Sequence, residues 1–219
     1  MTGRKLFALL VRRPDLSRSA FSAHWRQIHG PFALQIPGLR RYVQNHVRDW
    51  PGPPVAPPPV DGISEAWLDV DGPDDGTGGL HSDPAYLGGA RADEPNFLDV
   101  TRHDYLRVAE EPVRDGAADG LKVVLLARRR REIEPCRFDE AWTTADVEQR
   151  VPGLTRCIRN TVVCGPAAPR PAYDVVDELW WADHESLCAA RADPATWASL
   201  CRTDVADTAA VHMHPVVLR

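Results

Sequence analysis

Short apolar runs open the two halves of the chain in the same way. Leu6–Val11 is apolar throughout and is followed by two arginines. Leu121–Ala127 is interrupted only by one lysine and is also followed by arginines. An apolar run of this length, bounded by polar residues, predicts a strand that is buried on both faces. The pattern therefore predicts one such strand at the start of each half.

A helical spacing of apolar residues follows the first strand. Phe21, Trp25 and Ile28 recur at i, i+4 and i+7, which places them on one stripe of a helix. Ser17 precedes them and is well placed to cap that helix. The second half repeats the four-residue step after its own first strand, so a helix is predicted there too.

Further landmarks recur in the same order in both halves, and they mark strand starts, strand interiors, helix starts and strand ends. The pairs are Pro37-Gly38-Leu39 with Pro152-Gly153-Leu154, Glu65-Ala66-Trp67 with Glu178-Leu179-Trp180, Asp83-Pro84 with Asp193-Pro194, and Pro112-Val113 with Pro215-Val216. The first pair leads into strands predicted at Tyr42–Val47 and Cys157–Cys164. Such repeated order predicts β-α-β-β-α-β twice.

This order predicts an α+β fold of two fused ferredoxin-like modules. The Gly116–Gly120 stretch is the natural joint, which gives modules at residues 1–115 and 116–219. A four-stranded sheet with both helices on one face leaves its other face bare. We therefore expect the two sheets to pack together within the chain as a pseudo-dimeric α+β barrel, and further homodimerisation stays open.

Composition narrows the class of protein. A hydrophobic content of 43% with 26% charged residues is typical of a soluble globule with a core. The net charge of -5 argues against a nucleic-acid partner. No run reaches the roughly 18 apolar residues that span a bilayer, so no membrane partner is expected. The five cysteines form no C-x-x-C pair, which favours a reducing cytoplasm over a disulfide framework or a zinc site.

With these residues in view, the first half resembles the EthD-like family of the dimeric α+β barrel superfamily, from Lys5 to about Val113. The second half matches in outline only. The resembling residues are Arg12-Arg13-Pro14, Leu16-Ser17, Phe21, His24-Trp25-Arg26-Gln27-Ile28-His29-Gly30-Pro31, Pro37-Gly38-Leu39-Arg40-Arg41-Tyr42, and Asp61-Gly62-Ile63 with Glu65 and Trp67. The family includes cofactor-independent enzymes such as methylmuconolactone methylisomerase, and it is similar to cyclases and dehydratases of polyketides and aromatic intermediates.

The resemblance implies that His29 and Tyr42 line a pocket between the sheets. In the second half Thr144 falls where His29 would align, and Cys157 falls where Tyr42 would. The resemblance therefore implies chemistry in the first module only, with the second module completing the barrel.

The residues themselves fit an acid–base site. His29 precedes Gly30-Pro31, where proline removes a helical hydrogen bond and tends to kink the helix. A histidine there can turn toward an interior pocket and transfer a proton, or simply bond a freed carbonyl. Strand alternation places Tyr42, Gln44 and His46 on one face, and the implied role of Tyr42 points that face into the barrel.

Alternation in the next strand aims Glu65 and Trp67 inward as well. Glu65 is either a base raised in pKa by an aromatic cavity or a structural partner of a cation, and His46 is either a second acid–base group or a solvated strand end. The candidate catalytic residues are His29, Tyr42, Glu65 and His46, and the candidate substrate contacts are Trp25, Gln44, Trp50 and Trp67. Trp50 opens a proline-rich loop that is either a lid or a surface excursion.

No metal or other cofactor is expected. His212 and His214 fall on one face of the last strand, but no third ligand accompanies them, so packed histidines are the favoured interpretation. The leading hypothesis is a cofactor-independent lyase or isomerase that cyclises, dehydrates or rearranges a polyketide-like or aromatic carbonyl intermediate. The alternatives are a cofactor-free or haem-type monooxygenase of the same fold and a non-catalytic small-molecule binding module.

Overall fold

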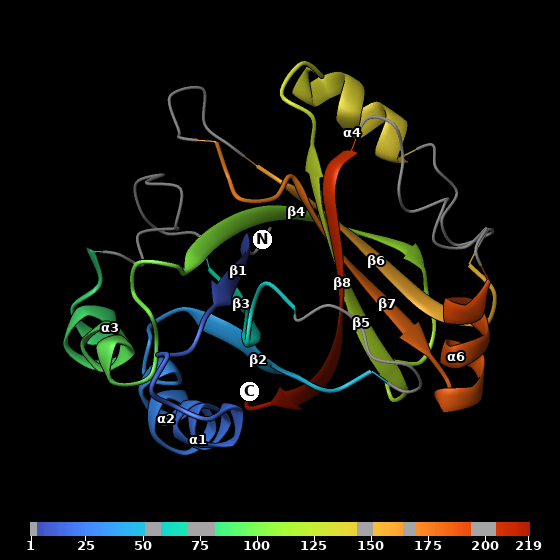
Figure 1. Cartoon of the computed structure of the whole chain (residues 1–219). Coiled ribbons are helices and arrows are strands. Elements are labelled where there is room, and N and C mark those ends of the chain that lie inside the picture. Colours follow the sequence, from blue (N-terminus) through green and yellow to red (C-terminus); the bar gives the residue numbers. More distant parts are fainter. Residues whose placement is uncertain (1–3, 51–57, 70–81, 144–150, 164–169, 194–204) are drawn as a thin grey trace.

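Eight antiparallel strands form one closed barrel in the computed structural model, which describes residues 4–50, 58–69, 82–143, 151–163, 170–193 and 205–219 (Figure 1). Around the barrel the order is β1-β3-β2-β8-β5-β7-β6-β4. The strands are β1 (Arg4–Leu10), β2 (Leu39–Val47), β3 (Gly62–Leu68), β4 (Asp104–Arg114), β5 (Leu121–Arg129), β6 (Leu154–Val162), β7 (Val175–Trp181) and β8 (Val205–Val217). Each of the strands that the sequence predicts is therefore present.

Helices and helical turns cover parts of the outer surface. In the first half they are α1 (Arg18–His24), the π-helical turn η1 (Trp25–His29), α2 (Gly30–Ala33), the π-helical turn η3 (Tyr86–Ala90), α3 (Arg91–Asp93) and the 3-10 turn η4 (Glu94–Asn96). The second half has α4 (Pro135–Thr143) and α6 (His184–Ala192). None of the described helices has the length and apolar composition that a bilayer crossing requires.

The predicted helix caps are partly confirmed. Ser17 Oγ accepts a hydrogen bond from the backbone N–H of Ala20 at 3.1 Å. Asp83 Oδ1 accepts from the N–H groups of Ala85 and Tyr86, as expected of a residue that opens a helix. Asp193, however, follows the last residue of α6, and the helix predicted from Asp193-Pro194 onward lies outside the described residues.

The prediction of an α+β chain of two fused ferredoxin-like modules is wrong. β2 pairs with β8 and β4 pairs with β6, so the strands of both halves form one continuous, closed antiparallel sheet with few helices. The landmarks identify strands within each half, but not which edges meet. Edge strands carry unpaired backbone N–H and C=O groups, and pairing them across the halves satisfies these groups. Barrel closure therefore replaces the face-to-face packing of two sheets.

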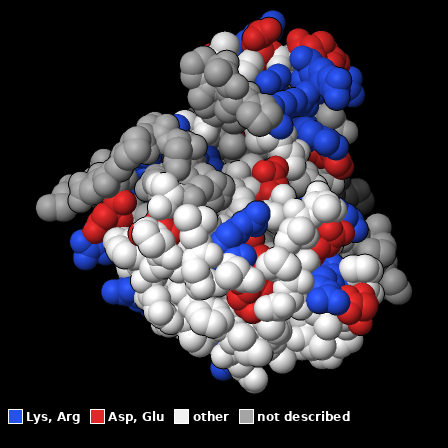
Figure 2. All heavy atoms as spheres, turned by 90° about the vertical axis from the view of Figure 1, so that its left-hand side faces the viewer, with Lys and Arg blue, Asp and Glu red and all other residues white. Residues whose placement is uncertain are grey.

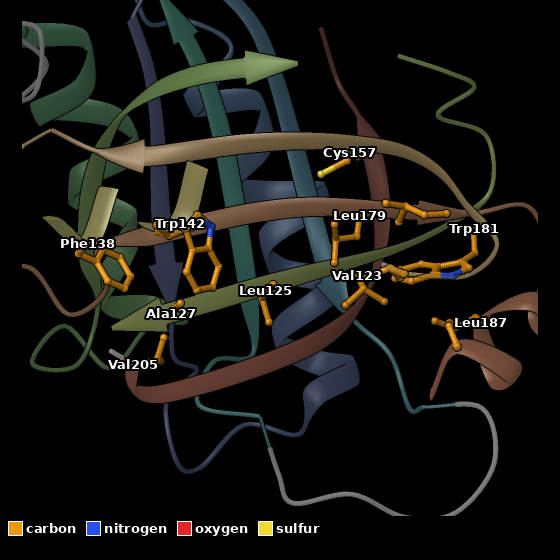
Figure 3. Close-up of a cluster of buried hydrophobic side chains, with 14 residues drawn as sticks. Val123, Leu125, Ala127, Phe138, Trp142, Cys157, Leu179, Trp181, Leu187 and Val205 are labelled. Atoms are coloured by element: carbon orange, nitrogen blue, oxygen red, sulfur yellow. The ribbon is translucent and has the colours of Figure 1, made fainter. Parts of the chain in front are cut away.

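Side chains alternate between the barrel interior and its outer surface. Phe7, Leu9, Ile63, Val124 and Met213 come from strands of both halves and meet in one interior cluster. A second cluster lies on the outer face of the second half, where α4 and α6 pack against the strands (Figure 3). It includes Val123, Leu125, Ala127, Phe138, Trp142, Cys157, Leu179, Trp181, Leu187 and Val205. The barrel thus has an interior layer and an outer layer of buried side chains.

Candidate functional site

A pocket lies between the outer face of the first-half strands and the helical turns that cover them. It encloses about 610 Å³, its mouth included. Its wall is mostly apolar and includes Leu6, Ala8, Leu10, Ala66, Leu68, Phe97 and Leu98. The polar side chains that line it are His29, Tyr42, Ser64, Tyr86, Glu94 and Tyr105. Few polar groups on an apolar wall are typical of a small-molecule site.

The π-helical turn η1 directs His29 into this pocket. An α-helix would keep Ile28 on the buried stripe of Phe21 and Trp25, as their spacing in the sequence predicts. In a π turn each residue rotates less, so the stripe moves on by one residue. Ile28 is accordingly 48% exposed, whereas His29 is 8% exposed. Gly30-Pro31 follows directly, so the predicted disturbance of the helix before the proline is present.

Asp93 holds His29 from behind. The Nδ1 atom of His29 lies 3.2 Å from Asp93 Oδ2, and His24 Nε2 lies 3.0 Å from both oxygens of the same carboxylate. Burial alone would raise the pKa of Asp93, but hydrogen bonds from Asn96 and His24 bring it below its usual value. An ionised carboxylate only accepts hydrogen bonds, so His29 Nδ1 carries the proton and its Nε2 is left as a base.

Burial also sets the protonation of His29 itself. Burial lowers the pKa of His29, and the charge of Asp93 opposes this shift only in part. The imidazole is therefore neutral at neutral pH, which is the form a general base requires.

Tyr42 presents a phenol to the same pocket. Trp25 Nε1 donates a hydrogen bond to Tyr42 Oη at 3.3 Å. Burial raises the pKa of Tyr42, so the hydroxyl keeps its proton at neutral pH and is able to donate it in a hydrogen bond.

A second polar group faces the pocket from η3, η4 and β4. Glu94 Oε1 accepts hydrogen bonds from Tyr86 Oη at 3.0 Å and from Tyr105 Oη at 2.6 Å, and Glu94 also pairs with Arg91. Burial raises the pKa of both tyrosines, and the charge of Glu94 adds to the shift. The two phenols are therefore neutral and held in fixed positions.

The expected orientation of the β2 face is wrong. Tyr42, Gln44 and His46 point toward the helical layer and not into the barrel. Gln44 Nε2 donates to the backbone carbonyl of Trp25 at 2.9 Å. His46 Nδ1 lies 2.6 Å from Ser22 Oγ, and its ring centroid is 4.5 Å from that of Trp25. The residues cross-strand from this face, Ala66 for Tyr42 and Ser64 for Gln44, line the pocket as well.

His46 is buried and is not the solvated strand end that one interpretation offered. Burial lowers its pKa to about 4, with further lowering from His214, Arg48 and Arg26. It does not line the pocket itself but packs against the indole of Trp25, which does.

Glu65 points into the barrel interior, as expected, and so does not share the pocket with His29 and Tyr42. It accepts a hydrogen bond from Asn45 at 2.7 Å and pairs with Lys122 at 2.5 Å and Lys5 at 3.3 Å. Glu178 pairs with the same two lysines. The four charges form a closed ring, and Lys5 and Lys122 are the only lysines in the chain.

The ring shifts the pKa values of Glu178 and Lys5. Burial alone would raise the pKa of Glu178, but Lys122 and Lys5 outweigh it and hold the pKa well below the usual value. Burial alone would lower the pKa of Lys5, but Glu178, Glu65 and Glu110 raise it above its usual value. This ring carries structural charge pairs, which favours the structural alternative for Glu65.

The remaining predicted contacts lie in three different regions. Trp25 lines the pocket. Trp67 lies in the interior with Lys5 Nζ 4.6 Å from its ring centroid. Trp50 packs against the outer cluster of the second half, 5.9 Å from the ring of His212. Within the described ranges no group of three or more His, Cys, Asp or Glu side chains is arranged to hold a metal.

The sequence patterns did not point to four residues of the site: Tyr86, Glu94 and Tyr105, which line the pocket, and Asp93, which contacts His29. A signal for three of them was present. Tyr86, Ala90 and Asp93 or Glu94 recur at helical spacing after the Asp83 cap, and two carboxylates on an otherwise apolar stripe predict buried partners.

The second half uses the matching positions differently. Cys157 stands where the first half has Tyr42, and the matching tryptophan, Trp142, donates from Nε1 to Asp177 at 2.9 Å. Burial raises the pKa of Asp177 to about 6, and the Trp142 hydrogen bond opposes that rise. Thr144 lies outside the described residues. The tyrosine of the candidate site therefore has no counterpart in this half.

Comparisons with known proteins identify the first half and the fold. Residues 13–101 match the family model described as the EthD domain. No curated protein sequence matches the chain. A solved structure described as an anthrone oxidase-like protein shares 13% identity and a TM-score of 0.66, over 99% of this chain and 94% of that one.

A proposed monooxygenase from Lactobacillus acidophilus NCFM shares 13% identity and a TM-score of 0.54 over the whole of both chains. Another, from Fusobacterium nucleatum subsp. nucleatum ATCC 25586, shares 13% identity and a TM-score of 0.52, over 99% of this chain and 92% of that one. At this identity the likeness shows a common fold. The predicted resemblance is confirmed for the segment that carries His29, Tyr42 and Asp93, because residues 13–101 match the EthD domain model.

Proposed function

We propose that this chain is an enzyme that removes a proton from an aromatic or polyketide-like carbonyl compound, using only its own side chains. The observation that carries the proposal is the neutral His29, held through Nδ1 by an ionised Asp93, on the wall of an apolar pocket. A positioned base of this kind contributes about 10²–10⁴-fold to proton transfer.

In the proposed reaction His29 Nε2 takes a proton from the carbon next to the substrate carbonyl. The C–H electron pair moves to form an enolate, and negative charge develops on the carbonyl oxygen. Tyr42 keeps its proton at neutral pH and donates a hydrogen bond to that oxygen. Return of the proton at a different atom gives rearrangement, and loss of a neighbouring hydroxide as water gives dehydration, which are the lyase and isomerase outcomes.

The tyrosines of the second polar group fit the substrate class. Tyr86 and Tyr105 are fixed by Glu94, so their rings and hydroxyls line the pocket in fixed positions. Rigid aromatic walls favour flat aromatic ligands, which stack or meet ring edges at little entropic cost.

A monooxygenase is the second candidate, and the likeness to the anthrone oxidase-like structure favours it. The first step is the same deprotonation. The enolate then reacts with O₂, one oxygen atom stays on the carbon as a new carbonyl, and the other leaves as water. The substrate methylene supplies the electrons, and O₂ is the oxidant.

Hydrogen–deuterium exchange tests the shared step. We expect the protein to speed exchange at the acidic carbon of hydroxylated aromatic ketones, anthrone among them, in D₂O without oxygen. His29→Ala should lower the enzyme-dependent rate by about 10²–10⁴-fold. His184→Ala, an exposed histidine in the second half, is the matched control and should leave it unchanged.

Oxygen consumption then separates the two candidates. Uptake of O₂ with the same ketones assigns the monooxygenase reaction, and conversion without uptake assigns the lyase or isomerase reaction. Exchange that His29→Ala leaves at the wild-type rate contradicts the proposed role of His29 in either reaction.

A further inference from the structure

The arginine run at the end of β5 contains one residue whose role is structural. Arg129 Nε bonds Asp174 Oδ1 at 3.0 Å, and its Nη1 donates to the carbonyl of Ile133. Arg12, at the matching position after β1, does the same with Asp61 at 3.1 Å and with the carbonyl of Leu16. Both halves thus use the matching arginine in the same structural contact. This contact accounts for Arg129 but not for the other arginines of the run.

Three more arginines gather around Arg129. Arg128, Arg131 and Arg170 line one hollow with it, open to solvent and enclosing about 850 Å³, with Pro171 and Ala172 as the remaining wall. In the first half, Val11 and Pro14 occupy the positions that match Arg128 and Arg131. The repeated structure therefore does not require them. Figure 2 shows basic side chains gathered at the top of the molecule, the end at which Figure 1 places α4.

The charged side chains that line the hollow are all arginines. Arg129 and Arg170 share Asp174, at 3.0 Å and 3.8 Å, and Arg128 pairs with Asp207 at 3.0 Å. Two further carboxylates lie close by, since Asp104 Oδ2 accepts a hydrogen bond from the N–H of Ala172 and Asp139 interacts electrostatically with Arg129 and Asp174. Among the described residues, Arg131 is the arginine of the hollow that has no ion-pair partner, so its guanidinium stays available there.

We propose that this hollow binds the phosphate group of a small molecule, outside the pocket of the EthD domain. Guanidinium groups present planar forks of N–H donors that match the oxygens of a phosphate in bidentate pairs. A phosphate monoester carries about -1.5 to -2 charge at neutral pH, which suits a lining whose charged side chains are all arginines. Arg131 and Arg170 supply the donors, since Arg129 stays with Asp174 in its structural role. Arg170 Nη2 also donates to the backbone carbonyl of Arg129, which holds this guanidinium at the hollow.

Calorimetric titration of the full chain at low ionic strength tests this site, with inorganic phosphate, pyrophosphate and phenyl phosphate as probes. We expect binding of at least one probe, weakened about tenfold or more by Arg131→Ala and by Arg170→Ala. Arg18→Ala is the matched control, because it removes one exposed arginine from an ion pair in the first half. It should leave the affinity unchanged.

The probes also separate the sources of phosphate. Tighter binding of phenyl phosphate indicates an ester, tighter binding of pyrophosphate an anhydride, and tightest binding of inorganic phosphate the free ion. Absence of binding at millimolar concentrations of all three overturns the proposal. Equal weakening by Arg18→Ala overturns it too, because the loss of one positive charge anywhere on the surface would then account for the effect.

Discussion

At the scale of single residues, the candidate site depends on one carboxylate, Asp93, that contacts two histidines. Asp93 contacts His24 on its more exposed side and His29 on the pocket side. The ionised carboxylate fixes the protonated nitrogen of His29 and limits the fall of its pKa. Asp93 is thus a positioning residue, and its effect is visible in the titration of His29.

Asp93→Asn should lower the pKa of His29 further, because burial then acts without an opposing charge. A base works in its neutral form, so the acid limb of the pH–rate profile should move to lower pH in this variant. The plateau rate should fall by ~10- to 100-fold, since the asparagine no longer fixes the tautomer. Long-range ¹H–¹⁵N NMR titration of His29 measures the pKa directly.

His24→Gln is the control, because it changes the other histidine that contacts Asp93. The charge of His24 lowers the pKa of His29, so its removal should not lower that pKa. If Asp93→Asn left the His29 titration where it is in the wild type, the positioning role would be wrong.

At the scale of elements, two π-helical turns meet the pocket from different parts of the chain. η1 carries Trp25 and His29, and η3 carries Tyr86 and Ala90. In each turn the two residues four apart are both buried on the inner side. The position of the site thus depends on the seating of these turns on the sheet.

Gly62, in β3, leaves the space that the Trp25 ring of η1 occupies against the sheet. A Cβ atom at Gly62 would lie 2.5 Å from an atom of the Trp25 ring, so Gly62→Ala must push the indole away. We expect a loss of about 1–3 kcal/mol in the free energy of unfolding, measured by urea denaturation. Gly88→Ala in η3 meets no atom within 4 Å and should change stability by no more than about 1 kcal/mol, in the stabilising direction.

Sequence patterns were sufficient to predict the strands but not the π-helical turns. The run Leu6–Val11 predicted β1, and Pro37-Gly38 predicted the stop before β2, because burial and turn chemistry are local. Gly38 indeed has φ 73°, although β2 begins at Leu39 and not at Tyr42. The inward turn of His29 follows from a π turn that regular helical spacing does not encode. The orientation of Tyr42 was inferred from the resemblance and not from contacts, and it was assigned to the wrong face.

At the scale of the whole molecule, the barrel joins its halves through two strand pairings and one charge ring. Each half supplies one lysine and one glutamate of the ring, and each lysine reaches the glutamate of the other half. Strand edges and long-range ion pairs depend on parts of the chain far apart in sequence. For this reason the sequence identified the strands but led to the wrong fold class.

The strand pairings between the two halves are ones that two identical copies of the first half can also form. β2 of the first half pairs with β8, the last strand of the second, and β4 pairs with β6, the second strand of that half. In two copies of residues 1–115, β2 of each could pair with β4 of the other and close both edges. Lys5 and Glu65 of each copy would supply the four charges of a ring.

We therefore expect residues 1–115, cut at the exposed joint, to form a homodimer. An isolated half would expose two strand edges and leave the interior face that carries Phe7 and Ile63 in water. Size-exclusion chromatography with light scattering should give twice the mass of the fragment. Lys5→Met should shift it toward unfolded monomer, because the two glutamates of the dimer would lose both cations. A folded monomer of 1–115 would show instead that closure of the barrel is not what stabilises this half.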